Sequence, residues 1–335
     1  MTTAAYPPRS AASAMPLLDV RGLRTHFHTR AGVVKAVDGV SFQLRRGEIL
    51  GLVGESGSGK SITAFSLMKL IDAPGRTTAD RLMFDGQDLL TLSDEGYRRL
   101  RGGPLAMIFQ DPMMTLNPTL RIDTQMVEAI LAHERVSRKA ARARAVQALA
   151  RVGIPAPAER MRVYPHHLSG GMRQRVTIAM ALLNSAKLII ADEPTTALDV
   201  TIQGQILYEV QKLCRETGTA LIWITHDLAV VSELADRIAV MYAGRIVETG
   251  TTAQIVDTPA HPYTRGLIAS IPSIETRGEE LVQIPGVMPS LSDLPTGCAF
   301  RTRCYKASAR CEQDPPTRTL MGSHTAVCWF PEEYP

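Results

Sequence analysis

A glycine-rich segment at residues 54–61 has the residue types needed to bind the phosphates of a nucleotide. Glycines let successive backbone N–H groups turn inward around phosphate oxygens, and the N-terminus of a following helix adds a favourable dipole. Lys60 would reach the β- and γ-phosphates, and the Ser61 hydroxyl would ligate Mg²⁺. A plain glycine-rich turn is the alternative, but the expected strand before the segment and the expected helix after it favour phosphate binding. The predicted nucleotide-binding residues are Gly54, Glu55, Ser56, Gly57, Ser58, Gly59, Lys60 and Ser61.

Two carboxylates, Asp192 and Glu193, follow the apolar run 188–191. If that run is a buried parallel strand, the sheet aims both carboxylates at the phosphate site. Asp192 would then hold the Mg²⁺ shell through water, and Glu193 would orient and polarise the water that attacks the γ-phosphorus. Acidic residues at strand ends are also common helix caps, so the pair gains its meaning from the phosphate-binding segment.

A second candidate anion site lies at residues 168–175, where a hydroxyl and two glycines precede an expected helix. The residues concerned are Ser169, Gly170 and Gly171. Spacing alone favours a simpler interpretation, a helix N-cap at Ser169 with two permissive glycines.

Four of the five cysteines crowd into the last forty residues. In a reducing cytosol such a local group of thiols indicates metal binding sooner than disulfides. The gaps of five, six and sixteen residues match neither zinc ribbons nor bacterial ferredoxins, so the spacing by itself identifies no metal. The four are Cys298, Cys304, Cys311 and Cys328.

Short apolar runs that alternate with helical stretches would position these groups. Strands are expected at 48–53, 105–109, 187–191 and 219–225, with helices from about 60 to 70, 168 to 184 and 200 to 217. This alternation predicts an α/β fold with a mostly parallel sheet, whose ligand loops lie at the carboxyl ends of the strands. Residues 17–42 instead predict two antiparallel strands, and 237–250 a closing hairpin.

The chain divides into three parts on this pattern. Residues 1–16 are rich in Ala, Ser and Pro and lack the apolar core of a signal peptide, so we expect them to be a disordered lead-in. Residues 17–255 form the nucleotide-binding domain, with a helical insertion at about 113–166 that is helical from about 123 to 153. Prolines interrupt the chain beyond residue 251, so 256–335 would be a smaller, irregular C-terminal domain with the four-cysteine cluster.

Charge and hydropathy narrow the possible partners. The net charge of +4 is too small to indicate nucleic-acid binding. No window approaches the roughly 18 to 20 apolar residues of a membrane-spanning helix. The sequence therefore predicts a cytosolic chain whose membrane role, if any, goes through partners.

The order of the motifs resembles that of the ATP-binding-cassette ATPases over roughly residues 18–270. Residues 168–175 resemble the family signature, and 196–199 its D-loop. The resemblance implies a P-loop NTPase fold in which two cassettes close head to tail over ATP, with Ser169, Gly170 and Gly171 of one capping the ATP on Lys60 of the other. Further family positions are Phe27 for stacking on adenine, Gln110 for Mg²⁺ and catalysis, Asp199 in the D-loop and His226 as the switch histidine.

Residues 261–267, His-Pro-Tyr-Thr-Arg-Gly-Leu, resemble an element of the ATPases of dipeptide, oligopeptide and nickel importers, and the cysteine segments extend that likeness. The resemblance implies ATP-driven peptide import at the cytoplasmic face of the membrane. It implies as partners a paralogous ATPase, two membrane permeases and an extracytoplasmic solute-binding protein, with no nucleic acid. Nickel import is the nearer alternative. A soluble cassette protein acting on ribosomes or DNA is the more distant one, since such proteins usually carry a second cassette.

The same resemblance implies a [4Fe–4S] cluster on the four cysteines, with a structural or sensing role. Structural zinc, or thiols left reduced or paired as disulfides, are the alternatives. ATP and Mg²⁺ complete the expected cofactors.

Overall fold

The computed structural model describes residues 15–30, 32–195, 200–271 and 283–332. Two sheets and the helices around them build an α/β fold, as the sequence predicts. Most of the predicted lead-in, residues 1–14, lies outside the described residues. The expected D-loop, with Asp199, also lies outside them.

The larger sheet carries the nucleotide-binding elements. Its five strands from β10 to β7 are parallel neighbours, whereas β11, β13 and β12 continue one edge in antiparallel pairing. In spatial order the strands are β12 (Thr317–Thr319), β13 (Thr325–Val327), β11 (Arg245–Thr251), β10 (Arg237–Tyr242), β3 (Ile49–Val53), β9 (Ala220–Thr225), β8 (Leu188–Asp192) and β7 (Leu105–Ile108).

Both faces of this sheet are buried, which explains why its strands are apolar runs without polar alternation. In β8, Leu188 and Ile190 join the core shared with the smaller sheet, whereas Ile189 and Ala191 join the core beneath the helices. Because both faces of the strands are packed in these cores, the loops at their carboxyl ends begin from fixed positions.

The smaller sheet is wholly antiparallel, with β1 at its centre. The antiparallel pairing of β1 with β2 confirms the strand pair predicted for residues 17–42. The sequence pattern did not reveal the three short strands that complete it. The strands are β1 (Leu18–Thr29), β2 (Gly32–Leu44), β4 (Gly75–Thr78), β5 (Arg81–Phe84) and β6 (Gln87–Asp88).

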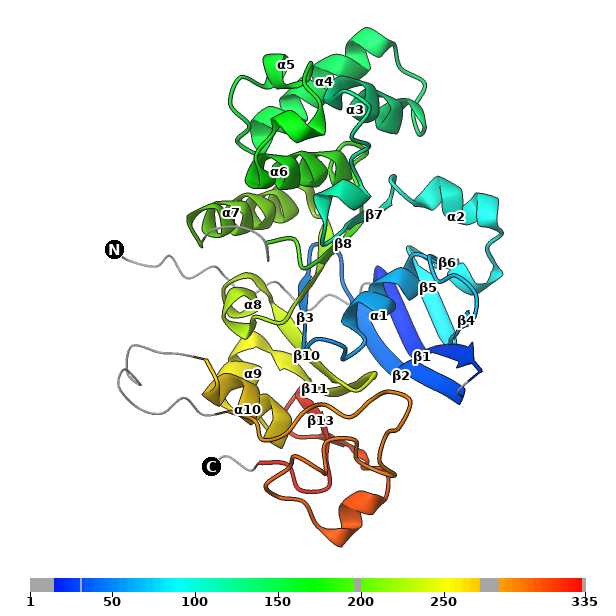
Figure 1. Cartoon of the computed structure of the whole chain (residues 1–335), viewed down its shortest axis with the longest axis vertical. Coiled ribbons are helices and arrows are strands. Elements are labelled where there is room, and N and C mark those ends of the chain that lie inside the picture. Colours follow the sequence, from blue (N-terminus) through cyan, green and yellow to red (C-terminus); the bar gives the residue numbers. More distant parts are fainter. Residues whose placement is uncertain (1–14, 31, 196–199, 272–282, 333–335) are drawn as a thin grey trace.

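Helices gather at the end of the molecule that is uppermost in Figure 1, where α3 to α6 pack above the sheets. The single helical run expected from 123 to 153 is two helices, because the chain turns between α3 and α4 and Ser137 caps the second. No helix within the described ranges is long and apolar enough to cross a membrane. The α-helices are α1 (Lys60–Leu67), α2 (Asp94–Leu100), α3 (Ile122–Leu131), α4 (Arg138–Arg151), α5 (Pro157–Arg160), α6 (Gly170–Ala181), α7 (Val200–Thr217), α8 (Leu228–Leu234), α9 (Thr252–Asp257) and α10 (Pro262–Ala269).

The C-terminal segment, residues 256–332 of the described chain, lies at the opposite end from α3 to α6 (Figure 1). It is joined to the larger sheet, because β13 pairs with β11. Buried Glu248 of β11 also holds the C-terminal segment in place. Its carboxylate accepts hydrogen bonds from the backbone N–H groups of Ala260 (2.7 Å) and His261 (2.8 Å). Nε2 of His324 also lies 2.7 Å from this carboxylate.

Candidate functional site

The glycine-rich segment forms a loop between β3 and α1, as predicted. Gly59 has φ of 102°, and a Cβ atom there would lie 2.3 Å from the carbonyl oxygen of Ala36, so only glycine fits. Lys60 is buried at the start of α1, and its Nζ donates to the carbonyl oxygens of Gly54 (2.7 Å) and Glu55 (2.9 Å). The ammonium group therefore lies inside the loop, where phosphate oxygens could replace these carbonyl partners.

Burial lowers the pKa of Lys60, and the carboxylates of Glu193, Asp192 and Glu55 oppose that shift. The same burial raises the pKa of Asp192, which Glu193 raises further and which Ser61 and Lys60 counteract. The loop and the end of β8 thus bring one buried ammonium group close to several carboxylates.

Asp192 ends β8 with its side chain buried, and the Ser61 hydroxyl donates to Oδ1 of Asp192 at 3.0 Å. A carboxylate and a hydroxyl at this distance are the hard oxygen donors that Mg²⁺ requires. The pair predicted as magnesium ligands is therefore brought together, and its chemistry fits that ion.

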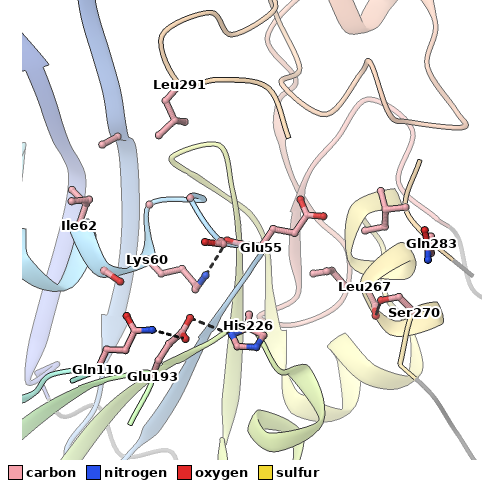
Figure 2. A pocket seen from close by; sticks show the side chains of 16 residues that line it. Glu55, Lys60, Ile62, Gln110, Glu193, His226, Leu267, Ser270, Gln283 and Leu291 are labelled. Carbon is pink, nitrogen blue, oxygen red and sulfur yellow. Dashed lines mark hydrogen bonds and ion pairs between the residues drawn. The ribbon is translucent and has the colours of Figure 1, made fainter. Parts of the chain in front are cut away.

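Glu193 lies directly beyond β8 with φ of 44°, the left-handed region that non-glycine residues rarely occupy. Its N–H donates to the carbonyl oxygen of Ile224 in the adjacent β9 at 2.9 Å, which holds the backbone there. Gln110, beyond β7, donates from Nε2 to Oε2 of Glu193 at 3.3 Å. Nδ1 of His226, beyond β9, lies 3.3 Å from the other carboxylate oxygen (Figure 2).

The three predicted catalytic side chains thus converge from the carboxyl ends of three neighbouring parallel strands. Gln110, also expected at the magnesium site, contacts Glu193. A carboxylate held from both sides, close to Lys60 and the phosphate-binding loop, is placed to act on a water molecule near the terminal phosphate.

These groups line one open cleft of about 770 Å³. Its opposite wall was not predicted: it includes Leu267 of α10, Ser270 and Gln283, as Figure 2 shows. Leu267 belongs to the segment 261–267 that carried the importer resemblance, whereas the other wall residues had no signal in the sequence. The predicted residues that line the cleft are Glu55, Ser56, Gly57, Gly59, Lys60, Ser61, Gln110, Glu193 and His226.

Several predicted residues do not line the cleft. Phe27 is half-buried in β1, where it pairs with Gly75. Ser169 caps α6, with its hydroxyl accepting from the N–H of Met172 at 3.3 Å, and both Ser169 and Gly170 are exposed on the surface. Gly171 follows in the same helix, outside the cleft.

Four cysteines, Cys298, Cys304, Cys311 and Cys328, line one small cavity in the C-terminal segment. Burial, aided by the neighbouring thiols, raises the pKa of Cys328 to about 11, against the opposing effect of a hydrogen bond from the Phe330 backbone N–H. Within the described part of the chain, however, no three His, Cys, Asp or Glu side chains are arranged to hold a metal ion. The prediction of an iron–sulfur cluster therefore finds its thiols together but not in the geometry of a metal site.

Two family models match the chain. Residues 37–196 match the family model described as ABC transporter, and residues 247–311 match the model described as oligopeptide/dipeptide transporter, C-terminal region. The oligopeptide transport ATP-binding protein OppD of Bacillus subtilis is 51% identical over 94% of this chain and 88% of its own length. The dipeptide transport ATP-binding protein DppD of the same organism is 48% identical, over 95% of each chain.

Among solved structures, a dimeric bacterial ABC transporter cassette superposes with a TM-score of 0.64 at 26% identity. The match covers 70% of this chain and 98% of that cassette.

Proposed function

This chain belongs to the ATP-binding-cassette transporter ATPases that carry an oligopeptide/dipeptide transporter C-terminal region, and we propose that its ATP hydrolysis drives import of di- or oligopeptides. The observation that carries the ATPase is the Gln110–Glu193–His226 arrangement beside Lys60. The likeness to peptide transport ATP-binding proteins over nearly the whole chain supports the choice of solute.

The chemistry follows from the residues in the cleft. Backbone N–H groups of the loop and Nζ of Lys60 bind the phosphates, and Ser61 and Asp192 would hold Mg²⁺. When bound, that ion neutralises phosphate charge. Oε1 or Oε2 of Glu193 accepts a hydrogen bond from the attacking water and orients it toward the γ-phosphorus. Gln110 and His226 fix the carboxylate in that orientation.

A second cassette completes the site in this proposal. Ser169, Gly170 and Gly171 are absent from the chain's own cleft, and the first two are exposed, as expected for groups that would bind the ATP of a partner. The partner would be a paralogous ATPase. The pair would lie at the cytoplasmic face of the membrane against two permeases, with an extracytoplasmic solute-binding protein and no nucleic acid.

We also propose that the four cysteines hold a [4Fe–4S] cluster. Their number, their thiol chemistry and their shared cavity support it. A four-iron cluster takes one thiolate on each iron, so its ligands stand farther apart than four ligands around a single ion. No catalytic step depends on the cluster, whose role would be structural or sensing.

Iron and acid-labile sulfide in the anaerobically purified chain test the cluster. About four of each per chain are expected, and Cys304→Ser should lose them. Cys214→Ala is the matched control, because Cys214 is buried in α7 and does not line the cavity. Stoichiometric zinc, or no metal after anaerobic reconstitution, would contradict the proposal.

Uptake in a deletion strain tests the transport function. Loss of the gene should make cells resistant to toxic di- and oligopeptide analogues, and the wild-type gene should restore sensitivity. Unchanged sensitivity together with lost nickel accumulation would refute peptide import and identify the solute as nickel.

A further inference from the structure

Glu55, the second residue of the phosphate-binding loop, is held from three sides. Its N–H donates to Oη of Tyr263 at 2.9 Å, and its carbonyl oxygen accepts from Nζ of Lys60 at 2.9 Å. Its carboxylate accepts two hydrogen bonds from Arg303, at 2.7 and 2.9 Å. Tyr263 and Arg303 both belong to the C-terminal segment, so two of the three contacts come from outside the unit of strand β3, loop and helix α1.

Arg303 is built into its position. Its side chain is only 5% exposed. Nε donates to the carbonyl oxygen of Pro285 at 2.9 Å, and Nη1 lies 3.5 Å from Oη of Tyr242. The guanidinium carbon lies 5.9 Å from the ring centres of both Tyr242 and Phe300, which pack against each other and against Tyr263. Such a fixed, planar guanidinium binds a carboxylate in one orientation only.

The chain that begins at Pro285 also covers the loop. A Cβ atom on Gly57 would lie 3.0 Å from the methyl carbon of Met288, so this methionine sits directly against the loop backbone. Leu291 lines the same cleft a little farther along (Figure 2). Arg303 therefore fixes both the loop, through Glu55, and the segment that covers it, through Pro285.

The Arg303–Glu55 ion pair changes the charge that a bound nucleotide would meet. The Glu55 carboxylate belongs to the lining of the cleft that would receive a triphosphate, and an uncompensated carboxylate there would repel the phosphates and attract Lys60. A two-fold hydrogen-bonded pair with a buried arginine neutralises it without leaving either charge unpaired.

We propose that Arg303, together with Tyr263, is a positioning residue for nucleotide binding: it fixes Glu55 so that the loop N–H groups face the phosphates, and it neutralises the Glu55 carboxylate. The C-terminal segment is then part of the nucleotide site. This inference rests on the proposed binding of ATP at the loop.

Calorimetric titration of the full chain with ATP and Mg²⁺ tests it. Arg303→Met keeps the apolar stem and removes the charge, and it should raise the Kd for ATP about tenfold, the size expected when a charged hydrogen-bonded partner is lost. Adding Glu55→Gln should bring the Kd back to within about threefold of wild type, because the repelling carboxylate is then gone.

Arg245→Met is the matched control. Arg245 also joins the cassette to the C-terminal segment, through its ion pair with Asp314, and it pairs with Asp38 within the cassette. It is neither among the hydrogen-bond partners of Glu55 nor in the lining of the cleft, so it does not share the role proposed for Arg303. An equal rise in Kd for Arg245→Met, or no rescue by Glu55→Gln, would mean that Arg303 only fastens the two parts together and would overturn the proposal.

Tyr263→Phe provides a second route if Arg303→Met does not fold, since it removes only the hydroxyl that accepts from Glu55. It should raise the Kd about threefold, as loss of one hydrogen bond implies, and an unchanged Kd would also overturn the proposal. A wild-type chain that binds no ATP would instead overturn the proposed function.

Discussion

Glu193 combines an unusual backbone conformation with a carboxylate held by two neighbours. A left-handed φ in a non-glycine residue costs on the order of 1–3 kcal/mol and persists only where the surroundings impose it. Here the hydrogen bond to Ile224 and the contacts to Gln110 and His226 impose it. This backbone conformation ends the strand and turns the Glu193 side chain into the cleft.

Glu193→Gln keeps the shape of the side chain but removes its charge and basicity. We expect ATP turnover by the assembled transporter to fall at least about a hundredfold, the usual contribution of a general base, while ATP still binds. Phosphate release and calorimetric ATP binding check the two parts separately. Glu128→Gln, on the exposed face of α3, is the control and should leave both unchanged. Undiminished turnover in Glu193→Gln would remove this residue from catalysis.

The start of α10 depends on a buried histidine. Nδ1 of His261 accepts from the N–H of Tyr263 at 3.1 Å, so the ring caps the helix in its neutral form, and Pro262 follows at the first helical position. Burial lowers the pKa of His261 to about 4, against a partial opposing effect of Glu248. Because the unfolded chain binds a proton near pH 6.5 and the folded chain does not, stability falls as pH drops from 6.5 toward 4.

His261→Asn should remove this acid sensitivity, since asparagine is a good cap that does not titrate. Between pH 7 and pH 5 the wild type should lose about 2 kcal/mol more unfolding free energy than the variant. Urea unfolding at the two pH values measures the difference. His28→Asn, at an exposed position in β1, should behave like wild type. Equal losses in wild type and His261→Asn would refute the assignment.

The elements that the sequence predicted share one property: their own residues determine them. β8 and β9 are apolar runs because both of their faces are buried, and the loop at Gly59 requires a residue without a side chain. β4 was missed because it is short and largely polar and forms by pairing with β1, which lies far earlier in the sequence. β12 was missed because its three residues are polar and exposed, although its partner β13 is the next strand along the chain.

The residues of the candidate site also differ in whether the local sequence could predict them. Motif spacing predicted Lys60, Asp192 and Glu193, whose roles depend on the local chain. It did not predict Arg303, whose role depends on a tertiary contact across 248 residues. A buried arginine in an irregular, proline-rich segment has no periodicity to reveal it.

At the scale of the whole molecule, two features fit the proposal that a second cassette completes the ATP site. The cleft is open, and the helix that begins at Ser169 faces outward at a position that does not line it. Two such molecules facing each other in opposite orientation would each supply what the other lacks. ATP bound between them would act as the contact that holds them together, and its hydrolysis would release them.

Ser169→Arg should therefore abolish ATP turnover in the assembled transporter while the isolated chain binds ATP normally. Ser137→Arg is a closely matched control, because Ser137 is likewise an exposed cap with a 3.2 Å bond to the N–H of Ala140. Both variants lose about 1 kcal/mol of capping energy, so melting temperatures should fall equally. If turnover survived in Ser169→Arg, this surface would not meet the partner's ATP.

The contact between Arg303 and Glu55 joins residues that are synthesised at different times. A ribosome adds about 5–20 residues per second, so roughly 12 to 50 seconds separate the synthesis of Glu55 from that of Arg303, 248 positions later. Throughout that interval the Glu55 carboxylate of the phosphate-binding loop lacks its Arg303 partner. On the proposal for Arg303, the nascent chain would acquire its full affinity for ATP only after the C-terminal segment has been made.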